Sequence, residues 1–192
     1  MVPEVALFAA PGVADREGRS LDNPTWEGLP VLFLVVESRP GWHKVRVSTR
    51  PNGTVAWIRA ADVELRTVAN RIVVEVGARR LTVLRGDTPL MSTTVAVGRS
   101  GTPTPQGRFF VDGIVRLSPP SRAYGVAQLS ISGFSPTLES FGGGIGQIAL
   151  HGTFAPALLG QAVSNGCVRL DNAAITQVLD LALTGTPVDI VA

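Results

Sequence analysis

Several features are scarce in this chain of 192 residues, and each absence excludes a class of protein. Cys167 is the one cysteine, so no disulfide bond can form within the chain. The longest apolar run, residues 29–36, is far shorter than the roughly 20 residues that cross a bilayer. The N-terminus lacks a basic start followed by an apolar stretch, so we expect no signal peptide in this chain. The formal net charge of +2 excludes a strong field that would recruit nucleic acid or an acidic membrane.

The composition is that of a globular protein, with 45% hydrophobic and 17% charged residues. Such a length allows one large domain or two small ones, each with its own core. The strand pattern restarts at Asn70, after a short linker near residues 67–69. We therefore predict two domains, residues 1–67 and residues 68–192.

The first segment has the pattern of short strands joined by tight turns. From Trp42 to Thr49 the side chains alternate between two faces, as in a half-buried strand. Residues 51–54, Pro-Asn-Gly-Thr, predict a turn, because Asn-Gly supplies the positive φ angles that a tight hairpin needs. The spacing of Trp42, this turn and Trp57 resembles a bacterial SH3-like domain, so we expect a small barrel here. Together with Trp26, these tryptophans fit either a core or a groove that binds glycan or peptide.

The second segment is rich in strands. Ile72, Val74 and Val76 share one face of a predicted strand, and Arg85-Gly86-Asp87 predicts the hairpin between the next two strands. The overall fold class is therefore mainly β. Further strands are predicted within Phe-Phe-Val (109–111), YGVAQLSIS (124–132), QIAL (147–150) and PVDIVA (187–192).

A single region near the C-terminus has a helical pattern. Apolar residues recur at positions i, i+3, i+4 and i+7 from Ile175 to Ala182. Asp171 is predicted as the N-cap, and Gly185 followed by Pro187 predicts the end of the helix. This helix follows closely behind the cysteine.

Cys167 lies in the stretch Ser-Asn-Gly-Cys-Val-Arg-Leu, residues 164–170. A thiol needs a base to become a useful nucleophile near neutral pH, because its unperturbed pKa is about 8.5. His43 belongs to the first segment, whereas His151 precedes the cysteine within the second. A strand, a short helix begun by Pro156 and a return into the cysteine loop fit the intervening chain. From the residues alone, a nucleophile with its base and a pair of inert core side chains both remain open.

The residues after the cysteine determine which side chains accompany it. If residues 167–170 are extended, Cys167 and Arg169 project to one face while the alternate side chains enter the core. Arg169 would then favour the thiolate and could bind a substrate carboxylate with its planar guanidinium. The alternative for Arg169 is a surface ion pair with Asp171.

Backbone groups of the same stretch are candidates for an oxyanion hole. Gly166 allows the backbone to approach a substrate closely. The amides of Asn165, Gly166 and Cys167 could then stabilise a tetrahedral intermediate.

Neither a metal nor an organic cofactor is expected. A zinc site requires three or four ligands, and only His151 and Cys167 are well placed, with Asp171 as a third candidate. The glycines of residues 142–146 are not followed by the Lys-Ser/Thr pair of a phosphate-binding loop. We therefore expect no metal and no cofactor.

Three stretches occur in an order that resembles the L,D-transpeptidase catalytic domain family (YkuD-like). They are TPTPQGRFFV (residues 102–111), IALHGT (residues 148–153) and SNGCVRL (residues 164–170), followed by a helix and GTPVDIV (residues 185–191). The resemblance covers about residues 70–191. It implies a β-sandwich-like fold and an extracytoplasmic enzyme, in the periplasm or cell wall, that acts on peptidoglycan stem peptides as donor and acceptor.

The resemblance also implies roles for individual residues. Cys167 would attack the carbonyl that joins the third residue of a tetrapeptide stem to its terminal D-alanine. His151 would take the thiol proton, and the backbone carbonyl of Gly152 would orient the imidazole. Arg169 and Ser164 would bind the substrate. An amine from a second stem would capture the acyl-enzyme and form a 3→3 cross-link, and carbapenems are expected to acylate the cysteine.

One departure and several alternatives accompany this interpretation. Asn165 stands where the family often has a histidine, so a second imidazole cannot take part in proton transfer. The alternatives are an L,D-carboxypeptidase and a non-catalytic protein that binds the cell wall. A cysteine hydrolase of the cell wall is disfavoured, because His151 precedes Cys167 here and those enzymes have the reverse order.

Overall fold

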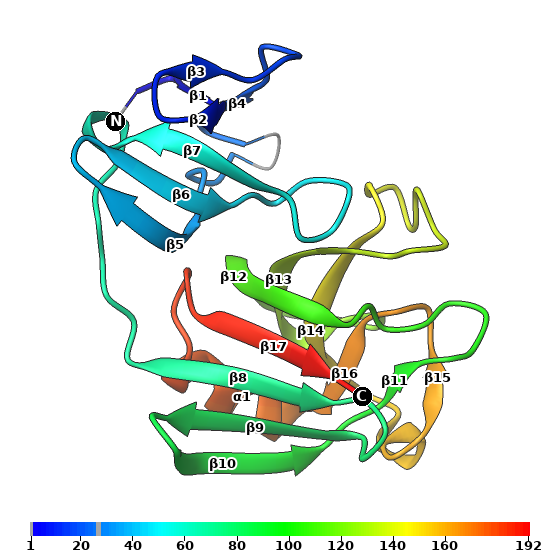
Figure 1. The fold of residues 1–192 in the computed structure, drawn as a ribbon. Helices are drawn as coiled ribbons and strands as arrows, with labels where there is room; N and C mark the ends of the chain where they lie inside the picture. Colours follow the sequence, from blue (N-terminus) through cyan, green and yellow to red (C-terminus); the bar gives the residue numbers. More distant parts are fainter. Residues whose placement is uncertain (1, 26–27) are drawn as a thin grey trace. The chain divides into compact units, whose positions relative to one another are not determined.

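The computed structural model describes residues 2–25 and 28–192, and the chain forms two compact units, Met1–Thr67 and Val68–Ala192. Strands dominate both units, and the described residues contain one α-helix (Figure 1). The predicted mainly β fold class is confirmed.

The first unit is built from two antiparallel sheets. A five-stranded sheet runs in the order β3-β2-β7-β6-β5, and β1 pairs with β4 in a two-stranded sheet. Among the described residues no pairing joins the outer strands β3 and β5, so the five strands form an open sheet and not a hydrogen-bonded closed barrel. The elements are β1 (Glu4–Ala6), β2 (Phe8–Ala10), β3 (Val13–Ala14), β4 (Ser20–Asp22), β5 (Leu34–Arg39), β6 (Trp42–Arg46), β7 (Val55–Arg59) and the 3₁₀ turn η1 (Ala60–Asp62).

The alternating pattern that begins at Trp42 is confirmed. His43, Val45 and Val47 are buried, and the residues between them are only partly buried. The chain then turns through Gly53, whose φ of +86° requires glycine, before it returns as β7. Local alternation and turn chemistry together specify this hairpin.

The tryptophans of the first unit have different surroundings. Trp57 is a core residue, with 6% of its surface exposed, and the guanidinium of Arg39 stacks over its ring at 4.8 Å. Trp42 is partly buried and meets the edge of Phe8, with ring centroids 4.9 Å apart. Trp26 lies outside the described residues.

The second unit contains an eight-stranded sheet in the order β10-β9-β8-β17-β12-β13-β14-β16. Figure 1 shows β17, the last strand, inserted between β8 and β12. A parallel pair, β11 and β15, forms a separate small sheet. The elements are β8 (Asn70–Glu75), β9 (Arg80–Arg85), β10 (Thr88–Thr94), β11 (Val97–Gly98), β12 (Gly107–Ser121), β13 (Gly125–Phe134), β14 (Gln147–Thr153), the 3₁₀ turn η2 (Pro156–Leu158), β15 (Ala162–Ser164), β16 (Val168–Asp171), α1 (Asn172–Leu181) and β17 (Pro187–Val191).

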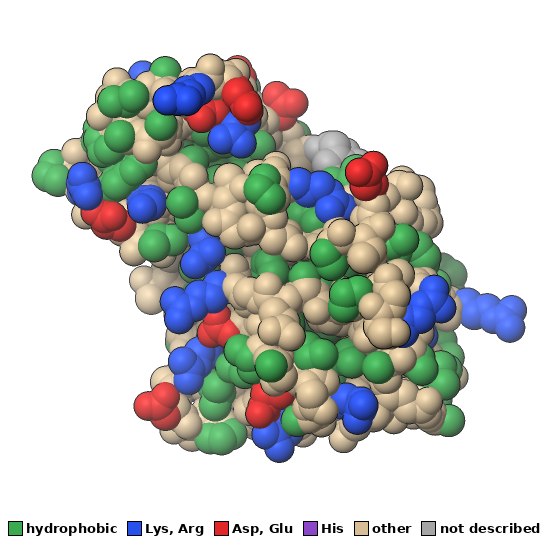
Figure 2. All heavy atoms as spheres, turned by 45° about the vertical axis from the view of Figure 1, so that its right-hand side comes forward, with side chains coloured by type: hydrophobic (Ala, Val, Ile, Leu, Met, Phe, Trp, Pro, Cys, Tyr) green, Lys and Arg blue, Asp and Glu red, His purple; other side chains and the backbone are tan. Residues whose placement is uncertain are grey.

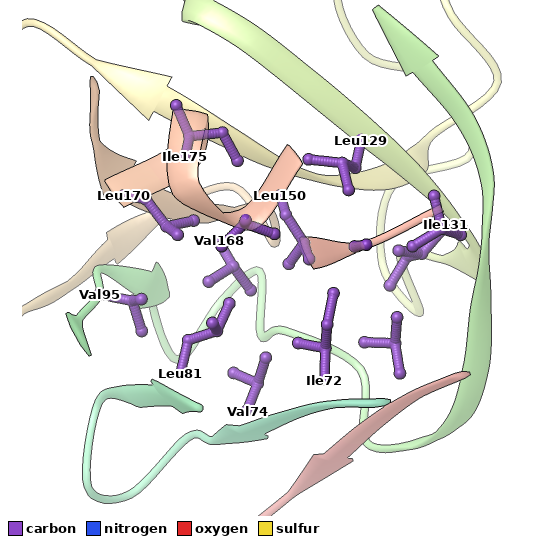
Figure 3. Packing of buried hydrophobic residues seen from close by; sticks show 14 of the residues in the cluster. Ile72, Val74, Leu81, Val95, Leu129, Ile131, Leu150, Val168, Leu170 and Ile175 are labelled. Atoms are coloured by element: carbon purple, nitrogen blue, oxygen red, sulfur yellow. The ribbon is translucent and has the colours of Figure 1, made fainter. Parts of the chain in front are cut away.

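The long strand β12 makes the second unit sandwich-like. Its first residues, 107–110, pair with β17, and residues 111–116 pair with β13. One strand therefore belongs to both halves of the sheet, and the halves enclose a common core. Figure 3 shows this core, in which side chains from β8 and β9 face those from β13, β14, β16 and α1. Its labelled members are Ile72, Val74, Leu81, Val95, Leu129, Ile131, Leu150, Val168, Leu170 and Ile175.

Helix α1 begins and packs as its sequence predicts. The carboxylate of Asp171 accepts a hydrogen bond of 2.8 Å from the backbone N–H of Ala173, which satisfies one of the free donors at the helix start. Ile175, Val178 and Leu179 are buried against the sheet. The helix predicted to begin at Pro156 is a single 3₁₀ turn.

Charges of both signs share the surface. On the face drawn in Figure 2, Arg and Lys side chains are interspersed with Asp and Glu side chains. None of the helices in the described ranges has the length and apolar character needed to cross a membrane.

Candidate active site

Two neighbouring parallel strands, β14 and β16, place the predicted histidine, cysteine and arginine. Leu150 pairs with Val168 in the strand register, and both side chains are fully buried in the core. His151 pairs with Arg169, so these two side chains project from the opposite face. Cys167 lies two residues before Arg169 and therefore shares that face. The predicted alternation after the cysteine is confirmed.

His151, Cys167 and Arg169 line one pocket with a volume of about 430 Å³. Asn165 lines the same pocket. His43, the second histidine of the chain, belongs to the first unit. Further lining residues that the sequence did not suggest are Tyr124, Phe141 and Phe154.

The imidazole of His151 is held from two sides. Its Nδ1 lies 2.7 Å from the backbone carbonyl oxygen of Gly152. A carbonyl oxygen can only accept, so Nδ1 carries the proton of the neutral ring and Nε2 keeps its lone pair. The ring of Tyr124 meets the imidazole edge-on, with centroids 5.1 Å apart.

The pocket favours the neutral form of His151, which has 3% of its surface exposed. Burial lowers the pKa of His151 from 6.5 to about 4, and the Arg169 guanidinium adds to this shift. The hydrogen bond to Gly152 acts in the opposite direction. At neutral pH the imidazole is therefore an unprotonated base.

The thiol of Cys167 is also kept neutral. Burial raises its pKa, against the opposing effects of the backbone N–H of Ala149 and the charge of Arg169. The Ala149 N–H lies 3.4 Å from Sγ and points a donor at the sulfur. Burial and the nearby cysteine raise the pKa of Tyr124 as well. In the resting state the pocket thus holds a neutral thiol and a neutral imidazole.

Close packing explains why residue 152 is a glycine. A Cβ at Gly152 would collide with Oδ1 of Asn172 and press on Ile175. The same Asn172 oxygen accepts a hydrogen bond of 3.2 Å from the backbone N–H of Val126. Gly125 is equally confined, because its Cβ would meet Gly152 and Asn172. These contacts therefore hold three segments against one another next to His151: the start of β13, the end of β14 and the first residue of α1.

Two residues with predicted roles in the cysteine loop are hydrogen-bonded within that loop. Ser164 is completely buried, its hydroxyl donates to the carbonyl oxygen of Cys167 at 2.6 Å, and it is not among the residues that line the pocket. The backbone N–H of Gly166 donates to the Ser164 hydroxyl at 3.1 Å, so it is not free to serve an oxyanion. Gly166 adopts a φ of +118°, and a Cβ there would press on Ile148. Of the three predicted amides, those of Asn165 and Cys167 remain as candidates.

A second loop supports the cysteine loop. Thr104 Oγ1 donates to the carbonyl oxygen of Gly166 at 2.8 Å and accepts from the backbone N–H of Gly98 at 2.8 Å. Thr102 Oγ1 donates to the carbonyl oxygen of Ser164 at 3.1 Å. The sequence predicts no contact between this stretch and the cysteine loop. The available signal was the pair of threonines that alternate with prolines, and it does not indicate which carbonyls they would meet.

Arg169 has an unsatisfied donor. Its Nε is a buried polar atom without a hydrogen-bond partner. The ion pairs of the described residues do not include one between Arg169 and Asp171, and Asp171 caps α1 instead. Within residues 2–25 and 28–192, no three His, Cys, Asp or Glu side chains are grouped as metal ligands would be. The arginine thus lines the pocket with one of its donors unsatisfied.

A thiol, a neutral imidazole and an unsatisfied arginine in one pocket are the groups that cysteine-dependent acyl transfer on an anionic substrate needs. The chain belongs to the L,D-transpeptidase catalytic domain family (YkuD), whose sequence model matches residues 69–190. It is therefore an L,D-transpeptidase-type enzyme that acts on peptidoglycan, as the resemblance predicts.

Individual relatives agree with this assignment. The chain is 29% identical over 175 residues to a Bacillus licheniformis protein named L,D-transpeptidase YkuD. The matched residues make up 91% of this chain and 95% of the relative. It is 32% identical over 124 residues to the Bacillus subtilis protein of that name, covering 65% and 67% of the two chains. A solved L,D-transpeptidase from Mycobacterium smegmatis shares the fold, with a TM-score of 0.51 at 15% identity over 83% of this chain and 82% of that one.

Proposed function

We propose that the second unit is a peptidoglycan L,D-transpeptidase that uses Cys167 as its nucleophile and forms 3→3 cross-links. The observation that carries this proposal is the shared pocket of His151 and Cys167, in which the imidazole has its Nε2 lone pair free. The substrate is a tetrapeptide stem, cleaved before its terminal D-alanine.

The first half of the reaction makes an acyl-enzyme. His151 Nε2 takes the thiol proton as Cys167 Sγ attacks the carbonyl carbon of the third stem residue. A C–S bond forms, and the π pair of the carbonyl moves onto its oxygen. When the tetrahedral intermediate collapses, the C–N bond breaks and the imidazolium gives its proton to the amine of D-alanine.

The second half transfers the acyl group. An amine from a second stem loses a proton to His151 and attacks the thioester carbonyl. The C–S bond then breaks, and the sulfur regains its proton. His151 begins each half as the neutral base and returns to that state after each transfer.

Backbone amides stabilise the oxyanion. The Cys167 N–H belongs to the residue that attacks, so it lies close to the carbonyl oxygen in the intermediate. Asn165 lines the pocket and adds either its amide or its side chain. A histidine is common at that position in the family, and Asn165 keeps the backbone donor but supplies no second imidazole.

Arg169 holds an anionic group of the stem. Its buried Nε has no partner, and its side chain lines the pocket. A carboxylate that binds there satisfies the guanidinium with charge-assisted hydrogen bonds. Stem peptides carry such carboxylates at their termini.

The first unit, residues 1–67, is proposed as an SH3-like domain that attaches the enzyme to the wall. The partly buried Trp42 and the stacked Arg39 supply an aromatic and cationic surface for this purpose. Such an enzyme works outside the cytoplasm, in the periplasm or the cell wall, where its substrate is found. Water in place of the acceptor amine would turn the same acyl-enzyme into an L,D-carboxypeptidase.

One experiment separates these activities. Purified protein is incubated with a disaccharide-tetrapeptide, and the products are analysed by mass spectrometry. Dimers that lack one D-alanine establish transpeptidation, tripeptide establishes carboxypeptidation, and unchanged substrate contradicts both.

Variants of the pocket test the mechanism in the same assay. Cys167→Ala should abolish turnover, and His151→Ala should lower it by roughly 10²- to 10⁴-fold. Cross-linking by the Cys167→Ala protein would end the nucleophile assignment. A carbapenem should add its mass to the wild-type protein and not to Cys167→Ala.

A further inference from the structure

The hydroxyl of Thr104 joins two loops at the back of the cysteine loop. Thr104 lies in residues 99–106, between β11 and β12, and has 3% of its surface exposed. Its Oγ1 accepts from the backbone N–H of Gly98 and donates to the carbonyl oxygen of Gly166, both at 2.8 Å. Because the Gly98 N–H can only donate and the Gly166 carbonyl can only accept, the direction of the hydroxyl proton is fixed.

This bond also fixes the peptide group that follows Gly166. The Gly166–Cys167 bond is absent from the cis peptide bonds of the described residues, and a trans peptide is planar with its C=O and N–H pointing in opposite directions. Since the Gly166 carbonyl faces Thr104, the Cys167 N–H points away from the 99–106 loop. The next peptide is held separately, because the Cys167 carbonyl oxygen accepts from the Ser164 hydroxyl.

We propose that Thr104 is a positioning residue that aims the backbone N–H of Cys167 into the pocket as a preformed oxyanion donor. The inference rests on the proposed acyl transfer at Cys167. An oxyanion donor is most effective when its direction is set before the reaction, because no reorganisation is then needed as charge develops. Thr104 does not contact the substrate and acts only through the Gly166–Cys167 peptide.

The proposal distinguishes two reactions of the same sulfur. Acylation passes through a tetrahedral oxyanion, so it needs the aimed Cys167 N–H. Alkylation by iodoacetamide is a displacement at a saturated carbon, so it needs the thiolate but no oxyanion donor. Loss of the Thr104 hydroxyl should therefore slow acylation and leave alkylation unchanged.

The test compares Thr104→Val, which removes the hydroxyl at nearly constant volume, with Thr104→Ser, which keeps it. Acylation is followed with the tetrapeptide and with 4-nitrophenyl acetate, and alkylation with iodoacetamide as a function of pH. We expect Thr104→Val to slow both acylations by about 100-fold, close to the loss of one oxyanion donor. Thr104→Ser should restore most of the rate. If the wild-type protein does not turn over the tetrapeptide, acylation by 4-nitrophenyl acetate still tests the role of Thr104.

Thr102→Val is the matched control. Its hydroxyl donates to the Ser164 carbonyl, which also accepts from the backbone N–H of Arg99 at 3.1 Å, and not to the Gly166 carbonyl that Thr104 binds. We expect a much smaller loss of acylation from this variant. Melting temperatures and circular dichroism establish that each variant is folded, and Thr104→Ala replaces Thr104→Val where the valine protein does not fold.

Two outcomes would overturn the proposal. Normal acylation in a folded Thr104→Val or Thr104→Ala protein would show that the hydroxyl is dispensable. Equal losses of acylation and alkylation, or equal losses in the Thr102 and Thr104 variants, would mean that the threonine maintains only the general shape of the loop.

Discussion

His151 and Arg169 occupy directly paired positions on the parallel strands β14 and β16. Burial lowers the pKa of His151 to about 4, and the guanidinium charge at the paired position adds to this shift. The same charge favours the thiolate of Cys167, but burial outweighs it and raises the pKa of the thiol. The resting site therefore holds two neutral groups and not a preformed ion pair.

The pH dependence of acylation should reflect this resting state. We expect kcat/KM for the tetrapeptide to stay at its plateau well below pH 6.5 and to fall with a midpoint near 4, where His151 becomes protonated. Arg169→Gln should move this midpoint upward, because it removes a neighbouring positive charge. Single-turnover acylation across the acidic range measures both midpoints. An acid limb at the ordinary histidine value in the wild-type protein would contradict the interpretation.

The same shift predicts a pH dependence of stability. Because the pKa of His151 falls from 6.5 in the unfolded state to about 4 in the folded state, the unfolded state binds the proton more tightly between these values. Stability is therefore fully present above pH 6.5 and is lost as the pH falls toward 4, by about 3 kcal/mol in all. In His151→Gln this part of the loss should be missing. Carboxylates titrate in both proteins, so the difference between them is the quantity to measure.

The choice of probe matters for that measurement. All three tryptophans belong to residues 1–67, so tryptophan fluorescence follows the first unit. Urea unfolding of the second unit is better followed by hydrogen exchange of the β14 amides. An identical pH dependence of the wild-type and His151→Gln proteins there would show that the imidazole is not held neutral by the fold.

Features specified within a few residues could be predicted from the sequence. The alternation after Cys167, the cap at Asp171 and the hairpin at Gly86 all appear in the structure. Each depends on side-chain period, capping or turn chemistry, which act between close neighbours in the chain. The sequence also shows the two reactive side chains in their order along the chain, His151 before Cys167.

Features that depend on distant segments could not be predicted in this way. The Thr104 hydroxyl and the Gly166 carbonyl are 62 positions apart in sequence. The burial of Ser164 follows from its place between two loops, and a serine beside a catalytic cysteine has the same local pattern whether it faces substrate or core. The double pairing of β12 likewise arises from long-range register, which local periodicity does not encode.

Substitution of Gly152 should disturb the support of the imidazole. A Cβ there would collide with Asn172 and lie 3.2 Å from Ile175, so Gly152→Ala should destabilise the second unit by about 1–3 kcal/mol. Gly101→Ala is the matched control, since a Cβ at Gly101 meets nothing within 4 Å. Urea unfolding of the two variants measures the difference. Equal stability would show that β13, β14 and α1 are not tightly locked at this point.

The second unit should fold and react alone. Every residue of its main core cluster and every residue that lines the pocket lies within 68–192. We expect a protein of these residues to give a cooperative unfolding transition and to turn over soluble tetrapeptide, while binding of intact cell-wall sacculi weakens. A truncated protein that is well folded by circular dichroism but inert would mean that residues 1–67 contribute to catalysis.

Arg169 offers a way to separate substrate binding from thiol activation. If its guanidinium holds a stem carboxylate, Arg169→Ala removes a charge-assisted hydrogen bond worth about 1.5–3 kcal/mol. This corresponds to a loss of roughly 10- to 150-fold in kcat/KM for a stem peptide. Alkylation of Cys167 by neutral iodoacetamide should change less, because burial and not Arg169 dominates the pKa of the thiol.

Arg169→Lys should rescue only part of the turnover, since an ammonium keeps the charge but loses the planar pair of donors. Comparing kcat/KM with the alkylation rate in both variants gives the assignment. If alkylation slows as much as turnover, the arginine serves the thiolate or the shape of the loop. Normal turnover in Arg169→Ala would show that the unsatisfied Nε of the wild-type arginine does not bind substrate. Another residue of the pocket would then have to bind the carboxylate, and Arg122 is the other arginine that lines it.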